Sequence, residues 1–261
     1  MKTFKFVLIV LFSLTAVYFA KADDFFDAML EAKKNLYEAT ESGNEGDIIK
    51  ARGQFERIRQ LNQDVWLVDY WIAMADYNIA MIGSGENDME KVKKYTKLGL
   101  ERIDGSILQR YDFADSYVLQ LMLIFNRWMY ESDQMESIMS ATQSAETAAL
   151  ENDPNNPRYW LVKGISQFYT PEPFGGGVDN ALVSFAKSES LFKTFVPESE
   201  IYPDWGEEII NGYIALAHLK RNDEGDIEIA KTYIDKALEI SPDSEFIKNI
   251  VMKEYNSKSG K

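Results

Sequence analysis

The chain has no cysteine and a single histidine, His218, among its 261 residues. Without cysteine there can be no disulfide, no thiol nucleophile and no thiolate metal site. One histidine removes most catalytic and zinc arrangements that depend on this residue, and no carboxylate lies one turn away to orient it. No residues combine into a nucleophile, a base and an orienting group. We therefore expect no metal, no cofactor and no enzymatic activity, with His218 in a structural role.

Positive charge is also scarce. The chain has 28 lysines and arginines against 42 aspartates and glutamates, and its formal net charge is −14. So acidic a surface repels nucleic acid and anionic membranes. It keeps a protein soluble, and it suits basic or cationic partners. We therefore expect no nucleic-acid partner.

Long apolar runs are missing except near the N-terminus. Two lysines precede an apolar run over residues 6–19, and the small residues Ala20 and Ala22 follow it. This order is typical of a secretory signal, and the run is shorter than the roughly 18–20 residues that span a membrane. We expect cleavage near Ala22 and an exported product, periplasmic or extracellular, that is soluble and has no membrane insertion.

The rest of the chain shows no sustained period-two alternation. Apolar residues instead recur at steps of three and four, which predicts an all-α protein. No Ser-, Gly- or Pro-rich linker interrupts this pattern, so we expect a signal peptide over residues 1–22 and one helical domain over residues 23–261. Eleven helices are expected, approximately over residues 24–41, a stretch with Ile48 and Phe55, 64–82, 88–103, 113–130, 133–151, 157–169, 179–195, 204–221, 226–240 and 244–255.

A joint between two helix pairs is recognisable at residues 153–157, Asp-Pro-Asn-Asn-Pro. Pro154 cannot continue the preceding helix, and Pro157 suits the first position of the next one. Gly164 lies one turn after Trp160, where the missing side chain would let a neighbouring helix come close. The last pair repeats small and large residues at regular steps, at Ala230, Ile234, Ala237 and Pro242.

These residues resemble the tetratricopeptide repeat (TPR) family. The resemblance implies about five antiparallel helix pairs plus a terminal helix, stacked as a right-handed α-solenoid. The first-helix aromatics lie 46, 43 and 53 residues apart, against about 34 in regular repeats. We expect inserted loops at 83–87, 104–112 and 170–177 to take up the difference; the aromatics concerned are Trp71, Tyr117, Trp160 and Tyr213.

In a TPR-like stack the first helix of each pair lines the concave face, so the resemblance implies a partner groove there. Aromatic and methionine side chains on such a face suit a peptide or a hydrophobic ligand. The same side chains could instead form ordinary core. The expected groove residues are Ile72, Asp76, Val118, Met122, Phe125, Leu161, Ile165, Phe168, Tyr169 and Phe174.

The loop at 170–177 ends in three glycines, Gly175, Gly176 and Gly177. Their backbone N–H groups, beside the start of a helix, could bind an anion or a carboxylate. The loop lacks the Lys-Ser/Thr continuation of a nucleotide loop. The alternative is a stiff connection with Phe174 in the core.

We expect an exported, non-catalytic scaffold that mediates protein–protein interaction through its concave groove. The alternative is a periplasmic carrier of a small hydrophobic ligand, because helical subunits associated with TRAP-type transporters have a similar repeat architecture. The carrier would have a closed cavity lined by Met122, Phe125 and Phe168. The partner's identity and the oligomeric state stay open.

Overall fold

The computed structural model describes residues 24–260, and every regular element in that range is helical. The first helix covers residues 24–41. The elements that follow are α2 (Glu45–Arg59), α3 (Val65–Gly85), α4 (Met89–Gln109), α5 (Ala114–Asn126), η1 (Arg127–Met129), η2 (Ser132–Gln134), α6 (Met135–Asn152), α7 (Pro157–Tyr169), η3 (Glu172–Phe174), α8 (Val178–Phe192), α9 (Glu207–Arg221), α10 (Asp226–Ile240), η4 (Ile247–Val251) and α11 (Met252–Ser259).

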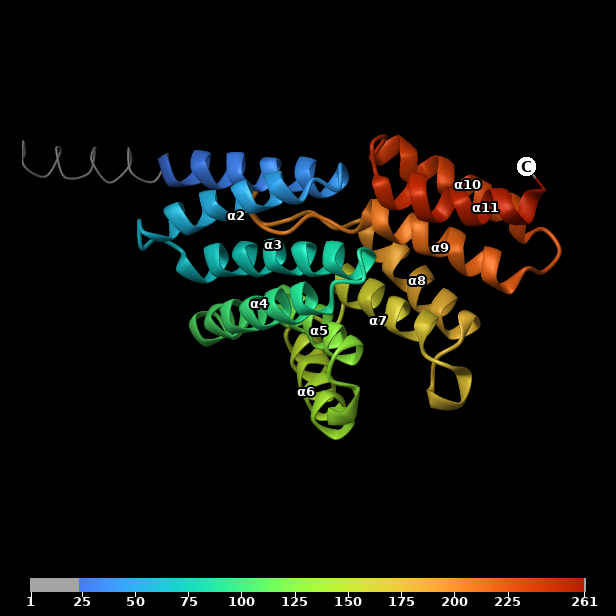
Figure 1. The fold of residues 1–261 in the computed structure, drawn as a ribbon, viewed down its shortest axis with the longest axis horizontal. Helices are drawn as coiled ribbons and strands as arrows, with labels where there is room; N and C mark the ends of the chain where they lie inside the picture. Colours follow the sequence, from blue (N-terminus) through green and yellow to red (C-terminus); the bar gives the residue numbers. More distant parts are fainter. Residues whose placement is uncertain (1–23, 261) are drawn as a thin grey trace, which may run out of the picture.

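Consecutive helices pack as antiparallel pairs (Figure 1). The first helix pairs with α2, α3 with α4, α5 with α6, α7 with α8 and α9 with α10, and α11 follows the last pair. The predicted all-α, TPR-like solenoid is confirmed. Among residues 24–260, no helix combines the length and apolar character needed to cross a membrane. The predicted signal peptide, with cleavage near Ala22, lies outside the described residues.

The predicted joint forms as expected. The Asn156 side chain accepts a hydrogen bond from the N–H of Tyr159, and Pro157 occupies the first turn of α7. A Cβ on Gly164 would lie 2.4 Å from the ring of Phe185 on α8. Only glycine permits this approach, so the predicted close packing at Gly164 is confirmed.

Two of the three predicted inserted loops are wrong. The helix α3 continues to Gly85, and α4 continues to Gln109. At the first site Gly83 lies inside α3, and a Cβ on it would lie 3.0 Å from the Lys91 side chain, so this glycine belongs to a close helix contact and does not mark a turn. At the second, the buried face of α4 extends to Ser106, which bonds to Ser116 of α5. The loop at 170–177 contains only the short η3 turn.

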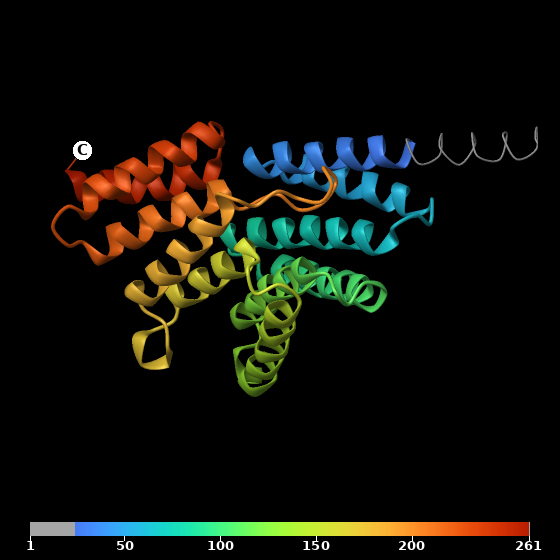
Figure 2. The ribbon, with the colours of Figure 1, turned by 180° about the vertical axis from the view of Figure 1, so that it is seen from behind.

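The longest irregular connection lies elsewhere, at residues 193–206, and we call it the strap. It leaves the C-terminal half after α8, runs between the first helix and α3, and returns to α9 (Figures 1 and 2). The helix predicted over 179–195 therefore ends too late, and the helix predicted over 204–221 begins too early. Pro197 and Pro203 lack the backbone N–H that a continuing helix needs.

The helix pairs form two lobes, residues 24–152 and residues 157–260. Within the stack, α6 packs on α5 but not closely on α7, so the regular succession of pairs is interrupted there. The two ends of the stack also meet, because Glu41 Oε1 accepts hydrogen bonds from Ser241 Oγ (2.6 Å) and from the N–H of Asp243 (3.1 Å). The inner side of the solenoid is therefore enclosed by the strap and by this contact.

Candidate binding face

Three of the predicted groove residues belong to the core. Ile72, Val118 and Leu161 have no exposed surface. They pack between helix pairs, where apolar burial stabilises the stack. The prediction placed them on an open face because, in a TPR-like stack, the first helix of each pair was expected to line a concave groove. In this structure a partner cannot contact them.

Asp76 is also buried, and its carboxylate is already paired. Arg52 Nε and Nη2 donate to its two oxygens at 2.6 and 3.2 Å, which ties α2 to α3. Burial raises the pKa of Asp76, and the arginine opposes that rise. Asp69, about two turns earlier on the same face of α3, makes a matching contact with Arg59. Asp76 therefore links two repeats and is not offered to a partner.

The remaining predicted residues divide between half-buried and exposed positions. Met122, Phe125 and Ile165 are half-buried, and Phe168 is buried. Tyr169 is 67% exposed, and its ring packs edge-on against Phe168 and Tyr213. This aromatic cluster is the accessible part of the predicted groove.

The glycine loop does not present free N–H groups. The N–H of Gly175 donates to Glu172 O, that of Gly176 to Pro171 O, and that of Gly177 to Gln167 O and Thr170 O. The predicted anion site is therefore wrong, because the donors it needs are used within the loop. Phe174 is 81% exposed, so the alternative placement of its ring in the core is wrong as well.

The strap makes its hydrogen bonds to side chains of the other lobe. Lys33 Nζ donates to the carbonyls of Glu200 (2.6 Å) and Tyr202 (2.9 Å). Trp71 Nε1 donates to the carbonyl between them, Ile201 O, at 2.9 Å. Three consecutive strap carbonyls are thus recognised by side chains of the first helix and α3.

Strap side chains are recognised too. Tyr37 OH donates to Asp204 Oδ1 (2.6 Å), and Lys33 Nζ forms an ion pair with Asp204 Oδ2 (2.8 Å). Trp205 Nε1 donates to the hydroxyl of Tyr70 at 2.9 Å, and Arg110 Nη1 donates to the hydroxyl of Tyr202 at 2.8 Å. Ile201 and Trp205 are only 6% and 7% exposed. The side chains that hold the strap form the strap-binding face: Lys33, Tyr37, Tyr70, Trp71 and Arg110.

The strap-binding face is electrostatically suited to an acidic segment. Lys33 is 4% exposed. Burial lowers the pKa of Lys33, whereas Asp204 acts to raise it. Burial, followed by the charge of Asp204, raises the pKa of Tyr37 well above its usual value. Of the five side chains, only Tyr70 accepts a hydrogen bond from the strap; the other four donate.

A buried ion pair lies beside both ends of the strap. Arg158 of α7 donates through Nε and Nη2 to the two carboxylate oxygens of Asp115 on α5, at 2.6 and 3.0 Å. Its guanidinium lies 4.3 Å from the ring centre of Phe195 and 5.8 Å from that of Trp205. Phe195 lies near the start of the strap and Trp205 near its end. The paired Arg158 therefore contacts the strap at both of its ends.

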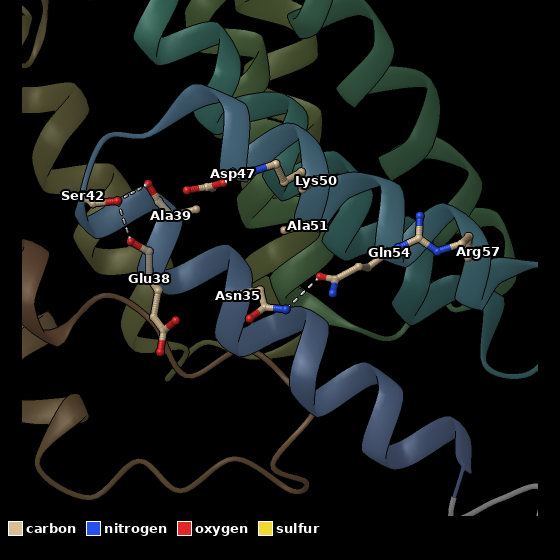
Figure 3. A pocket seen from close by; sticks show the side chains of 9 residues that line it. All are labelled: Asn35, Glu38, Ala39, Ser42, Asp47, Lys50, Ala51, Gln54 and Arg57. Carbon is tan, nitrogen blue, oxygen red and sulfur yellow. Dashed lines mark hydrogen bonds and ion pairs between the residues drawn. The ribbon is translucent and has the colours of Figure 1, made fainter.

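Two of the pockets in the described part of the chain are relevant to the site. The first, of about 550 Å³, lies between the first helix and α2, where Asn35 and Gln54 point toward each other and form a hydrogen bond (Figure 3). The second, of about 380 Å³, lies beside the strap and includes Val196 and Tyr202 in its wall. Neither is lined by Met122, Phe125 or Phe168. Within the described residues, no three His, Asp or Glu side chains gather where they could hold a metal ion.

His218 has an orienting carboxylate that does not lie one turn away along the chain. Its Nδ1 lies 2.7 Å from Asp226 Oδ1, and its ring stacks on Tyr233. Arg221 donates to both oxygens of the same aspartate and, as the largest cause, holds the pKa of Asp226 well below its usual range. Asp226 is eight residues from His218 and begins α10. The turn between α9 and α10 brings the two side chains together.

Solved structures resemble this chain, among them a haemophore and a TPR protein, although no protein-family model and no curated protein matches it in sequence. The HusA haemophore from Porphyromonas gingivalis is 20% identical, with a TM-score of 0.62 over 73% of this chain and 91% of that chain. A thermophilic TPR protein from Thermus thermophilus is 15% identical, with a TM-score of 0.57 over 88% of this chain and 100% of that chain. At these identities the likeness shows a shared TPR-like helical fold.

Proposed function

We propose that the protein is a non-catalytic scaffold that binds an extended polypeptide segment on its strap-binding face. The observation that carries this proposal is the hydrogen bonding of three consecutive strap carbonyls by Lys33 and Trp71. Extended peptides are recognised in this way, with main-chain hydrogen bonds for affinity and side-chain sites for specificity. The TPR-like architecture supports it, since such folds generally mediate protein interactions.

The proposal is tested by selecting peptides from a random displayed library against the full mature chain with Tyr202→Ala, a substitution that removes one strap contact and so leaves the face more accessible. We expect the selected peptides to lose binding on Lys33→Met and to keep it on Lys34→Met. Lys34 is the matched control, because its side chain is exposed on the same helix and makes only a surface ion pair with Glu38. Peptides that bind both variants equally would place the partner surface elsewhere.

A ligand carrier is the second candidate. The likeness to a haemophore supports it, and so does the exposed ring of Tyr169 beside Phe168 and Tyr213. Exposed aromatic surface suits a flat apolar ligand. Titration with haem, followed by its absorbance, tests this candidate. Saturable binding that weakens on Tyr169→Ala but not on Lys33→Met would support the carrier, and an absence of saturable binding would oppose it.

A further inference from the structure

The strap carries a short sequence that fits its binding face position by position. Ile201 and Trp205 are buried, Pro203 between them is buried, and the ring of Tyr202 packs edge-on against Trp66 and Phe113 at 5.6 Å each. Asp204 meets Lys33 and Tyr37. The fitted pattern is aliphatic, aromatic, proline, acidic, aromatic.

The charge of the face restricts what else could occupy it. A lysine or arginine in place of Asp204 would put a second positive charge beside Lys33, which is buried and would lose its ion-pair partner. Loss of the carboxylate alone would leave the Tyr37 hydroxyl without its acceptor and would leave the Lys33 ammonium with only the carbonyls of Glu200 and Tyr202. The face therefore selects an acidic residue at this position.

The first half of the strap is far less tightly held than the second. Val196 is 80% exposed, residues 193, 194, 198 and 200 are exposed, and the pocket of about 380 Å³ runs beside this half. Irregular connections of this length within compact domains are often functional. Residues 201–205, which carry the recognised pattern, therefore resemble a short bound peptide. The more exposed first half of the strap connects this peptide to α8.

We infer that the strap-binding face recognises, in a partner protein, an extended segment with the pattern aliphatic–aromatic–Pro–Asp/Glu–aromatic, and that the strap is its built-in competitor. This inference rests on the proposed function and adds the chemistry of the partner. A tethered segment acts at an effective concentration of roughly millimolar, so a partner segment binds measurably only when the strap is weakened or the partner is itself held close.

The test uses the full mature chain with the strap weakened by Tyr202→Ala and Asp204→Ala, and a labelled, end-capped peptide with the sequence of residues 198–206. Fluorescence anisotropy should show that the peptide binds this variant at least about tenfold more tightly than the wild-type chain, because the competitor is weakened. The same peptide with lysine at the Asp204 position should bind at least about tenfold more weakly. Adding Lys33→Met to the weakened variant should abolish binding, whereas adding Lys34→Met should not.

Several outcomes would overturn the inference. One is equal binding of the aspartate and lysine peptides, and another is binding that is insensitive to Lys33→Met. A third is no binding to a weakened variant whose helical circular dichroism and unfolding temperature show that it is folded. If the double variant does not fold, Asp204→Ala alone carries the same comparison, since this side chain is partly exposed. Library peptides that depend on Lys33 but lack the pattern would reject the pattern and leave the proposed function standing.

Discussion

Two irregular segments of this molecule invite comparison, the strap at 193–206 and the glycine loop at 170–177. Both are rich in proline or glycine and both connect helices of the C-terminal lobe. The loop satisfies its N–H groups with its own carbonyls and leaves Phe174 in solvent. The strap instead bonds to Lys33 and Trp71 of the other lobe. The comparison shows that composition identifies an irregular segment, whereas its partners decide whether it takes part in recognition.

The largest expected effect comes from removing the lysine that holds the strap. Lys33→Met removes the donor to two strap carbonyls and to Asp204 Oδ2, while Tyr37 still donates to Asp204 Oδ1. Hydrogen bonds to charged groups contribute about 1.5–3 kcal/mol each, and the cost of burying the Lys33 ammonium offsets part of their sum. We expect the free energy of unfolding in urea to fall by about 2–4 kcal/mol. The Lys34→Met control should change it by less than about 0.5 kcal/mol. Equal effects of the two substitutions would mean that the strap is not held by Lys33.

A pH dependence should follow from Tyr37. Its folded pKa lies well above 10 because of burial and Asp204, whereas its unfolded pKa is near 10. Above pH 10 the unfolded chain therefore releases this proton while the folded chain keeps it, and stability falls as the pH rises. The contribution is up to about 1.4 kcal/mol per pH unit. Between pH 9 and pH 11 the free energy of unfolding, measured in urea, should fall less steeply for Tyr37→Phe than for the wild type.

A smaller effect is expected at the far end of the recognised pattern. Trp205→Phe keeps an aromatic ring beside Arg158 but loses the bond from Nε1 to the hydroxyl of Tyr70. We expect a loss of about 1 kcal/mol in the free energy of unfolding. In a double-mutant cycle with Tyr70→Phe, the two losses should be non-additive, because both remove the same hydrogen bond. Strict additivity would show that this bond does not contribute.

The smallest effect should come from the glycine loop. Phe174→Ala removes a ring that is mostly in solvent, so we expect a change within about 0.5 kcal/mol. Peptide binding to the strap-weakened variant should also stay unchanged. A large loss of stability or of peptide binding would show that the glycine loop, like the strap, takes part in contacts with the rest of the molecule.

The positions of many helices could be predicted from the sequence. The bounds of the helices at 24–41, Pro157–Tyr169 and Asp226–Ile240 agree with the sequence pattern, because periodicity, caps and prolines act locally. The errors arose where a glycine was treated as a turn signal although it serves helix packing, as at Gly83. Apolar spacing could not distinguish an inner face from core, which is why Ile72 and Val118 were expected in a groove.

The strap-binding face was missed for a different reason. The only signals in the sequence were Pro197, Pro203 and the aromatic residues between and after them, and these mark an irregular segment without showing where it docks. Trp71 was expected as a first-helix aromatic of the repeat, yet its contact with the strap was not foreseeable.

The sequence by itself determined the all-helical pairing, because helix periodicity and capping depend on residues a few positions apart. It also determined the acidic character and the absence of thiol chemistry. Only the tertiary structure decided that the inner face is occupied and that the two ends of the stack meet. The hydrogen bonds responsible join residues that are 92 to 202 positions apart along the chain, from Arg110–Tyr202 to Glu41–Asp243. No local pattern specifies such partners; they are selected when the lobes pack and the carbonyls of an irregular segment must find donors.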